Sequence, residues 1–110
     1  LETEDQRRGY EVQFDTRTLP YLNVWKNTAA VEDGYVVGLE PATGFPNPRS
    51  FEEKQNRVVP LSGGESKTFR LKLQPLLSEA EVKQSMDRIR ALQPENAAVH
   101  PAPLKEWSPA

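Results

Sequence analysis

The sequence predicts a mainly β protein, a portion of an antiparallel β-sandwich followed by one C-terminal helix. Several short segments alternate apolar and polar residues with the period of a strand, and one later segment has the period of a helix. A length of 110 residues suits one domain with one small core. We expect strands within residues 1–77, a helix at 78–93 and a proline-rich extended tail at 94–110.

The first strands are expected before residue 41. Residues 9–15 (GYEVQFD) alternate, which predicts a half-buried strand with Glu11 on its polar face. Residues 19–25 (LPYLNVW) are apolar on both sides, which predicts a strand that is covered on both faces. After a turn at Asp33-Gly34, residues 35–40 (YVVGLE) are rich in β-branched and aromatic residues and predict a third strand.

Prolines and glycines interrupt the pattern after Glu40. Three prolines within residues 41–48 remove hydrogen-bond donors, so we expect the chain to leave the sheet at about Glu40. The polar residues 49–56 are expected to form a loop, and LSGGES at 61–66 a turn. Residues 67–74 (KTFRLKLQ) alternate clearly and predict another strand.

A capping box predicts where the helix starts. Ser78 and Glu81 have the S-x-x-E spacing of a helix N-terminus, and Val82, Met86 and Ile89 recur at helical spacing. The tail beyond residue 94 contains four prolines and either remains in solvent or lies across a neighbouring surface through its apolar side chains, Leu104 and Trp107.

Composition excludes several classes of function. The formal net charge is −2 and no basic cluster is present, so nucleic acid is not an expected partner. No segment approaches the roughly 20 apolar residues that cross a bilayer, so we expect no membrane partner. The absence of cysteine excludes a disulfide framework and a thiolate metal site, and we expect a cytoplasmic protein without a metal.

A single carboxylate stands where an apolar strand breaks into a proline-rich loop. Glu40 shares a strand face with Val36 and Gly38, and Gly38 leaves open space beside it. A carboxylate partly shielded from water in this position can serve as a general base. On spacing alone, the simpler interpretation is a strand end that faces water or pairs with an arginine.

Three segments carry a family resemblance: YLNVWKN at 21–27, DGYVVGLEPATGFPNPR at 33–49 and VPLSGGES at 59–66. They resemble the closing strands of the aldose 1-epimerase (galactose mutarotase-like) superfamily. The similarity is greatest to an uncharacterised bacterial branch whose ends read W-K-N, G-L-E-P-x-T-x-F-P and L-x-P-G-E. The resemblance covers residues 19–74, and its most specific element is LEPATGFP at 39–46.

The resemblance implies a fold and a reaction. The fold would be the C-terminal part of a galactose mutarotase-like super-sandwich, and the reaction the interconversion of sugar anomers. The family's catalytic base maps by position onto Glu40. In this family the base takes the proton of the anomeric hydroxyl while a histidine acid protonates the ring oxygen. This chemistry implies a sugar substrate and no cofactor.

Two departures from the family pattern matter. Gly63 replaces the proline of the L-x-P-G-E turn, which should loosen that turn. The family's catalytic histidines precede the motif, whereas the histidine of this chain, His100, lies in the tail downstream. We therefore expect the catalytic acid outside this chain, with the remainder of the same sandwich as another chain, or a homo-oligomer, as partner. The alternative is a shortened relative that kept the end of the fold and lost the reaction.

Four further residues are candidates for substrate binding. Trp25 can offer an aromatic face to a sugar, or belong to the core. Asn27 can hydrogen-bond hydroxyl groups, or be a solvated strand end. Phe45 can form a wall of the pocket or anchor the loop, and Arg49 can bind an anionic group of a substrate or be a surface residue.

The favoured function is carbohydrate epimerase or mutarotase chemistry with Glu40 as base. The alternatives are a non-catalytic carbohydrate-binding module that uses the same sheet, and a purely structural part of a larger β-sandwich. A histidine that faces Glu40 would favour the enzyme.

Overall fold

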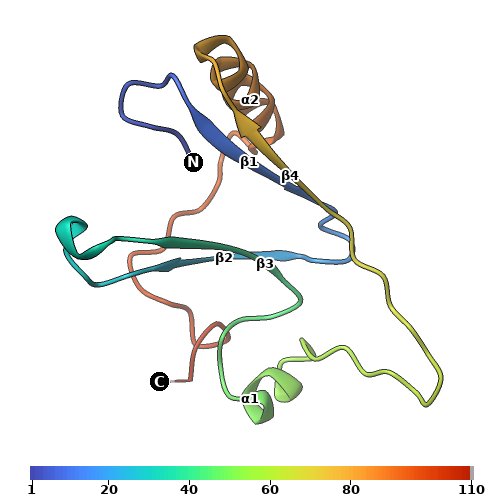
Figure 1. Cartoon of the computed structure of the whole chain (residues 1–110). Helices are drawn as coiled ribbons and strands as arrows, with labels where there is room; N and C mark the ends of the chain where they lie inside the picture. The colour runs from blue at the N-terminus through green and yellow to red at the C-terminus, as the bar shows by residue number, and fades with distance from the viewer. Residues whose placement is uncertain (110) are drawn as a thin grey trace. The chain divides into compact units, whose positions relative to one another are not determined.

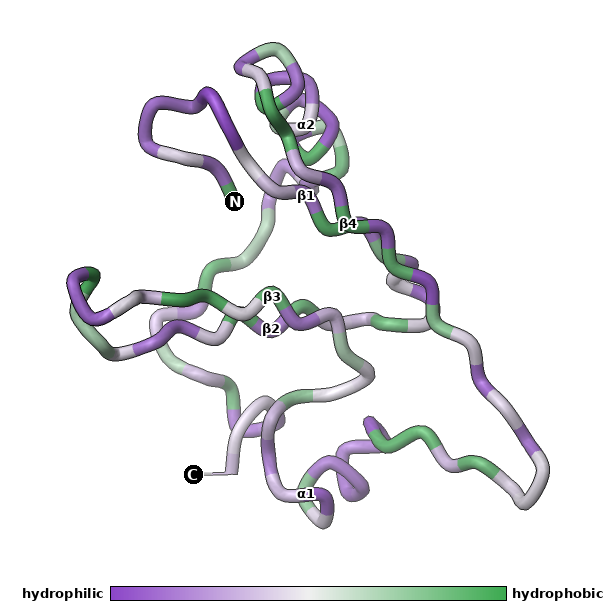
Figure 2. Tube along the Cα trace, viewed as in Figure 1, coloured by the Kyte–Doolittle hydropathy of each residue, from purple (hydrophilic) through white to green (hydrophobic). Residues whose placement is uncertain are grey.

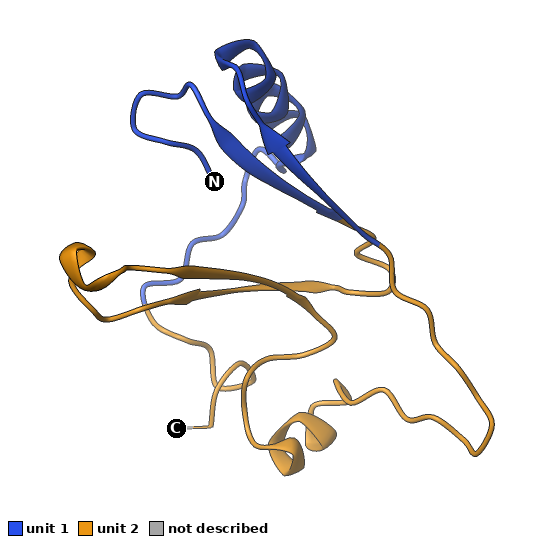
Figure 3. Ribbon diagram, in the orientation of Figure 1, with its two compact units in different colours: residues 1–13, 71–101 blue, residues 14–70, 102–110 orange. Residues whose placement is uncertain are grey.

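A computed structural model describes residues 1–109. These residues form two compact units, one from residues 1–13 and 71–101, the other from residues 14–70 together with the chain from 102 onward (Figure 3). Four strands make two small antiparallel sheets, and the main helix lies in the C-terminal part. The predicted fold class, mainly β with a C-terminal helix, is confirmed.

The first unit combines a two-stranded sheet with a helix. β1 (Gly9–Phe14) pairs with β4 (Leu71–Leu76), which runs in the opposite direction, and α2 (Glu79–Leu92) packs against β4 (Figure 1). Leu76 and Val82 are its buried apolar side chains, so one residue of β4 and one of α2 make the core of this unit.

The N-terminus of α2 is capped as the sequence predicts. Ser78 accepts a hydrogen bond from the Glu81 backbone N–H at 3.3 Å, and the Glu81 carboxylate accepts one from the Leu77 backbone N–H at 2.8 Å. One of the otherwise unpaired donors of the first helical turn, the Glu81 N–H, is thereby satisfied, and the Glu81 side chain binds the residue before the cap. Val82 is buried, but Ile89, at the far end of the predicted apolar stripe, is exposed.

Glu11 is buried, which corrects the expectation that it lies on a polar, solvated face. Its carboxylate accepts hydrogen bonds from Ser85 and Gln13, and from Arg88 at 2.8 Å. The alternation in β1 separates two faces but does not say which one is covered, and Ser85 and Arg88 of α2 lie on the Glu11 side. The hydrogen bond from Ser85, then those from Gln13 and Arg88, lower the pKa of Glu11 to about 2 despite burial.

The second unit contains a β-hairpin and a short helix. β2 (Tyr21–Lys26) pairs antiparallel with β3 (Val37–Ala42), and a 3₁₀ turn, η1 (Val31–Asp33), lies in their connection. Gly34 ends that turn with φ of 88°, a conformation that glycine adopts without strain. Asn23 lies opposite Glu40, and Trp25 opposite Gly38, so these four residues share one face of the hairpin.

Three predicted boundaries in this region and beyond are wrong. β3 continues through Pro41 to Ala42, because it is an edge strand in which a missing N–H is tolerated. Residues 49–54 form α1 (Arg49–Lys54) rather than a loop, since Glu52 of this helix has a buried partner described below. β4 begins at Leu71, four residues later than predicted, and runs through Pro75 to Leu76.

The apolar faces of the strands are less covered than predicted. In β2, Leu22 is 49% exposed and Val24 50% exposed, so this strand is not covered on both faces by the described residues. Leu71 and Leu73 of β4 are exposed too. Figure 2 shows these hydrophobic stretches along β2, β3 and β4. Residues 1–109 therefore do not provide the second covering layer that the apolar residues of these strands predict.

The structure also bears on membrane insertion. No helix within residues 1–109 combines the length and the apolar character that a bilayer span requires.

We expect Glu11→Gln to destabilise the unit that contains β1 and α2 by about 1 to 3 kcal/mol, because it removes charge-assisted bonds from Ser85 and Arg88. The pKa of Glu11 is lowered to about 2 in the folded protein, so its stabilising effect is complete above about pH 4.5 and is lost as pH falls toward 2. Urea unfolding at pH 7 and pH 3 should show a smaller pH dependence in the variant. Glu4→Gln, at an exposed site, is the control; equal curves for Glu11→Gln and wild type at both pH values would contradict the prediction.

Candidate functional site

A cleft of about 750 Å³ lies within the second unit. Its walls come from β2, the end of β3, the loop that follows, α1 and residues 57–69. Glu40, Phe45 and Arg49 all line it, so three of the residues singled out in the sequence meet at one cleft. Its size is within the roughly 300–1,000 Å³ usual for small-molecule sites.

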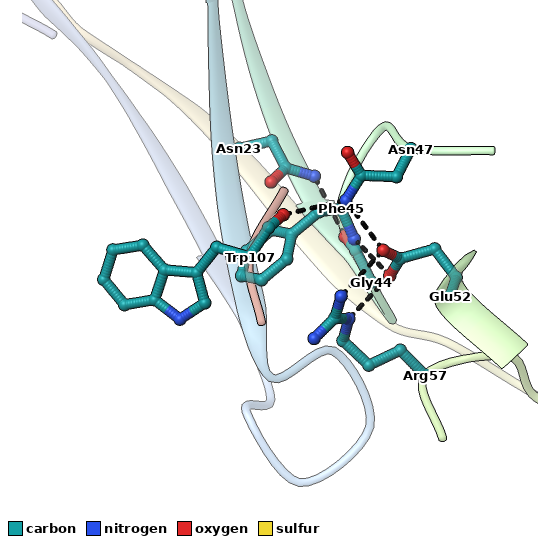
Figure 4. Close-up of polar contacts among 7 residues, drawn as sticks. All are labelled: Asn23, Gly44, Phe45, Asn47, Glu52, Arg57 and Trp107. Atoms are coloured by element: carbon teal, nitrogen blue, oxygen red, sulfur yellow. Dashed lines mark hydrogen bonds and ion pairs between the residues drawn. The ribbon is translucent and has the colours of Figure 1, made fainter. Parts of the chain in front are cut away.

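A buried carboxylate holds the loop after β3 in place. Glu52 of α1 forms a two-point ion pair with Arg57, at 2.6 Å to Nε and 2.8 Å to Nη2, and both side chains are over 90% buried (Figure 4). The same carboxylate accepts a bond from the Phe45 backbone N–H at 3.0 Å and one from the Asn47 side chain at 2.8 Å. Every acceptor position of Glu52 is therefore used, which is what a buried ion pair requires.

The charge state of Glu52 follows from these contacts. The hydrogen bonds from Arg57 lower the pKa of Glu52 to about 2, and those from Asn47 and the Phe45 backbone act in the same direction. Burial opposes the shift, since it disfavours the charged form. Glu52 is therefore a fixed anion neutralised by Arg57, and it is unsuited to accept a proton near neutral pH.

Gly44 is required by this arrangement. A Cβ atom at residue 44 would lie 2.6 Å from Glu52 Oε2 and 3.3 Å from the Arg57 Cβ. The Gly44 carbonyl also accepts a hydrogen bond from the Asn23 side chain at 3.1 Å, which ties the loop to β2 (Figure 4). The glycine of the LEPATGFP motif thus permits the loop to approach the ion pair closely.

Aromatic side chains complete the anchoring of the loop. The Phe45 ring lies 4.6 Å from Tyr21 and 6.3 Å from Trp107, and the Arg57 guanidinium lies 4.8 Å from its centre. The Asn47 side chain donates to the Trp107 carbonyl at 2.8 Å. Of the two alternatives for the tail, the structure therefore shows contact with a neighbouring surface, at Trp107. Phe45 both lines the cleft and anchors the loop.

Glu40 stands at the edge of the cleft with an exposed side chain. A Cβ atom at residue 38 would lie 2.7 Å from Glu40 Oε1, so the carboxylate lies over the space that Gly38 leaves open. The described residues do not shield it from water as the sequence suggested. Its role as a base stays a prediction.

Trp25 shares the hairpin face of Glu40 and is 52% exposed, so it is not a core residue among residues 1–109. Asn27 is engaged in the connection between the strands: its Oδ1 accepts from the Ala29 backbone N–H at 2.9 Å and its amide donates to the Gly34 carbonyl at 3.5 Å. Trp25 therefore lies on the same hairpin face as Glu40, whereas the Asn27 side chain forms hydrogen bonds within the connection between the two strands.

Arg49 extends from α1 beside the cleft. Its Nε bonds to Glu53 Oε1 at 2.8 Å, one helical turn away, and its side chain remains 77% exposed. Such exposed pairs contribute little to stability. Arg49 is thus accessible to a ligand in the cleft.

Sequence reasoning missed Asn23, Glu52 and Arg57. The signal for the helix was the polar run at 49–56, for which a loop is predicted although Arg49 and Glu53 have the i,i+4 spacing of an ion pair on a helix. The sequence around Asn23 did not indicate its role, because that role depends on the cross-strand position of Asn23 opposite Glu40. Within residues 1–109, no three His, Asp or Glu side chains gather closely enough to hold a metal ion.

We expect Arg57→Met to destabilise the protein by about 3 to 5 kcal/mol, because it leaves the buried Glu52 carboxylate without its partner. The double variant Glu52→Gln/Arg57→Met should recover part of this loss, since no charge is then buried alone. Urea unfolding of both variants measures the effect. Arg49→Met, which breaks an exposed pair, should cost less than about 1 kcal/mol, and an equal cost for Arg49→Met and Arg57→Met would contradict the assigned importance of the buried pair.

Comparison with known proteins gives one match. Residues 1–74 match the family described as "Domain of unknown function (DUF4432)". No curated protein and no solved structure matches the chain. Since the match covers more than half of the sequence, including the hairpin, the cleft loop and Glu40, the chain belongs to the DUF4432 family.

Proposed function

We propose that this chain contributes to a carbohydrate site of the aldose 1-epimerase type, in which Glu40 is the general base of anomer interconversion. The observation that carries the proposal is the shared face of the β2–β3 hairpin. It presents a carboxylate (Glu40), an amide (Asn23) and a half-exposed indole (Trp25) next to a cleft of small-molecule size. Carboxylates and amides hydrogen-bond hydroxyl groups, and an aromatic face packs on the apolar side of a sugar ring.

The resemblance of LEPATGFP to the aldose 1-epimerase motif supports the same assignment of Glu40. The surrounding structure gives the motif a physical role. Gly44 and Phe45 tie the loop to the Glu52–Arg57 pair, so the backbone beyond Glu40 is held in one conformation. A general base has to be positioned within hydrogen-bond reach of its proton, and a fixed loop next to it serves that purpose.

The proposed chemistry balances without a cofactor. Glu40 takes the proton of the anomeric hydroxyl, the C1–O5 bond breaks as the C1 carbonyl forms, and an acid protonates O5. Rotation about C1–C2 presents the other carbonyl face, and the reverse steps close the ring. The residues that line the cleft include no histidine. A histidine acid of the kind that the resemblance implies would therefore come from outside the residues that line the cleft.

A non-catalytic carbohydrate-binding module is the second candidate. It is favoured by the exposure of Trp25 and of Glu40, since a binding surface needs an accessible aromatic platform but no shielded base. The two candidates differ in whether bound sugar exchanges its anomers.

Glu40→Gln tests the catalytic role. In the native protein we expect it to lower the rate of α-to-β exchange of an aldose by about 100-fold or more, the usual contribution of a general base. Exchange is measured by ¹H NMR magnetisation transfer between the anomeric protons. Glu32→Gln, at an exposed carboxylate that does not line the cleft, is the matched control and should keep the rate. Undiminished exchange in the Glu40→Gln variant would show that Glu40 is not the general base. Sugar binding without anomer exchange in the wild-type protein would favour the binding module.

Trp25→Ala tests the sugar platform. We expect about a two- to tenfold loss of sugar affinity, the size of one aromatic contact, and a smaller loss in Trp25→Phe. The affinities are measured by isothermal titration calorimetry, because Trp25→Ala removes the indole whose fluorescence would otherwise report binding. Unchanged affinity in Trp25→Ala would exclude this residue from the platform.

A further inference from the structure

The charged side chains that line the cleft include more cations than anions. Four ionic side chains besides Glu40 line it, namely Arg49, Glu52, Arg57 and Lys67. Glu52 and Arg57 neutralise each other in their buried pair. What remains facing the cleft is one carboxylate, Glu40, and two cations, Arg49 and Lys67.

Neither cation is neutralised by another residue of the cleft. Arg49 pairs with Glu53, which does not line the cleft, and because this pair is exposed and weak an anionic ligand can compete for the guanidinium. The Lys67 ammonium lies 5.7 Å from the centre of the Phe69 ring, and this cation–π contact orients the ammonium group without neutralising its charge. Both Lys67 and Phe69 line the cleft.

The two cations discriminate between classes of sugar. A neutral aldose gains hydrogen bonds from Glu40 and Asn23, but it gains little binding energy from the charges of Arg49 and Lys67. An anionic group gains charge-assisted bonds from both, and the planar fork of arginine matches a carboxylate or a phosphate in two-point geometry. Arg49 and Lys67 come from α1 and from the segment before β4, whereas Glu40 comes from β3, and all three line the same cleft. A sugar whose anomeric hydroxyl is at Glu40 can therefore present a second, anionic group to the two cations.

We propose that the sugar bound at this cleft carries an anionic group, held by Arg49 and Lys67, in addition to the anomeric hydroxyl at Glu40. This inference rests on the proposed function and adds the substrate class to it. A uronate carboxylate and a terminal phosphate share the chemistry that the two cations recognise.

The test compares acidic and neutral sugars on the native protein. Glucuronate, glucose 6-phosphate and glucose are assayed by NMR anomer exchange and by saturation-transfer binding. We expect wild-type kcat/KM to be at least about tenfold higher for one of the acidic sugars than for glucose, as charge-assisted bonds predict. Arg49→Met and Lys67→Met should each reduce this preference several-fold, and added salt should weaken it. Comparison of glucuronate with glucose 6-phosphate identifies whether the two cations recognise a carboxylate or a phosphate.

The control is Lys54→Met, an exposed cation of the same helix as Arg49 that does not line the cleft. It should keep the preference. Equal kcat/KM for acidic and neutral sugars, or a preference unchanged in Arg49→Met and Lys67→Met, would overturn the inference. The outcome for the base is separate: Glu40→Gln should still bind the acidic sugar without exchanging it, and retained exchange in that variant would reject the proposed function instead.

Discussion

The second unit depends on one buried ion pair. Glu52 and Arg57 lie five residues apart, yet through Phe45, Asn47 and Trp107 they connect α1, the loop after β3 and the tail. A buried carboxylate without partners would cost several kcal/mol, so the loop must supply its donors. The requirement fixes Gly44, because a side chain there would occupy the place of the carboxylate oxygen. The cleft and its distribution of charge follow from this constraint.

A buried, hydrogen-bonded carboxylate also holds the first unit together. Glu11 of β1 is buried and accepts bonds from Ser85 and Arg88 of α2, so a carboxylate joins the strand to the helix. Among the described residues, the buried apolar side chains are Leu19, Leu76 and Val82. Both units therefore rely on hydrogen-bonded carboxylates where a larger domain would rely on apolar packing. Polar links of this kind specify one geometry more strictly than apolar contacts do.

The open apolar faces agree with the proposed function. A two-stranded sheet is marginal by itself and becomes stable when further strands or a helix cover it. The half-exposed Leu22 and Val24 lie on the hairpin face opposite Glu40 and Trp25, so one face is apolar and the other carries the polar groups of the candidate site. An arrangement with one face for packing and one for a ligand is expected of a strand pair in a sugar-binding sandwich.

Local pattern alone determined much of this protein. The alternation around β1, the capping box of α2 and the two turns at Gly34 and Gly64 were predictable, because each depends on residues adjacent in the chain. The position of Glu40 beside Gly38 followed from the period of a strand. Only the tertiary structure decided that Glu11 is buried, that Glu52 pairs with Arg57 and binds the loop after β3, and that β3 continues through Pro41. Periodicity separates the faces of a strand or helix, but it does not say which face is covered. That depends on partners that can be distant in the sequence, as Glu11 and Ser85 are, 74 positions apart.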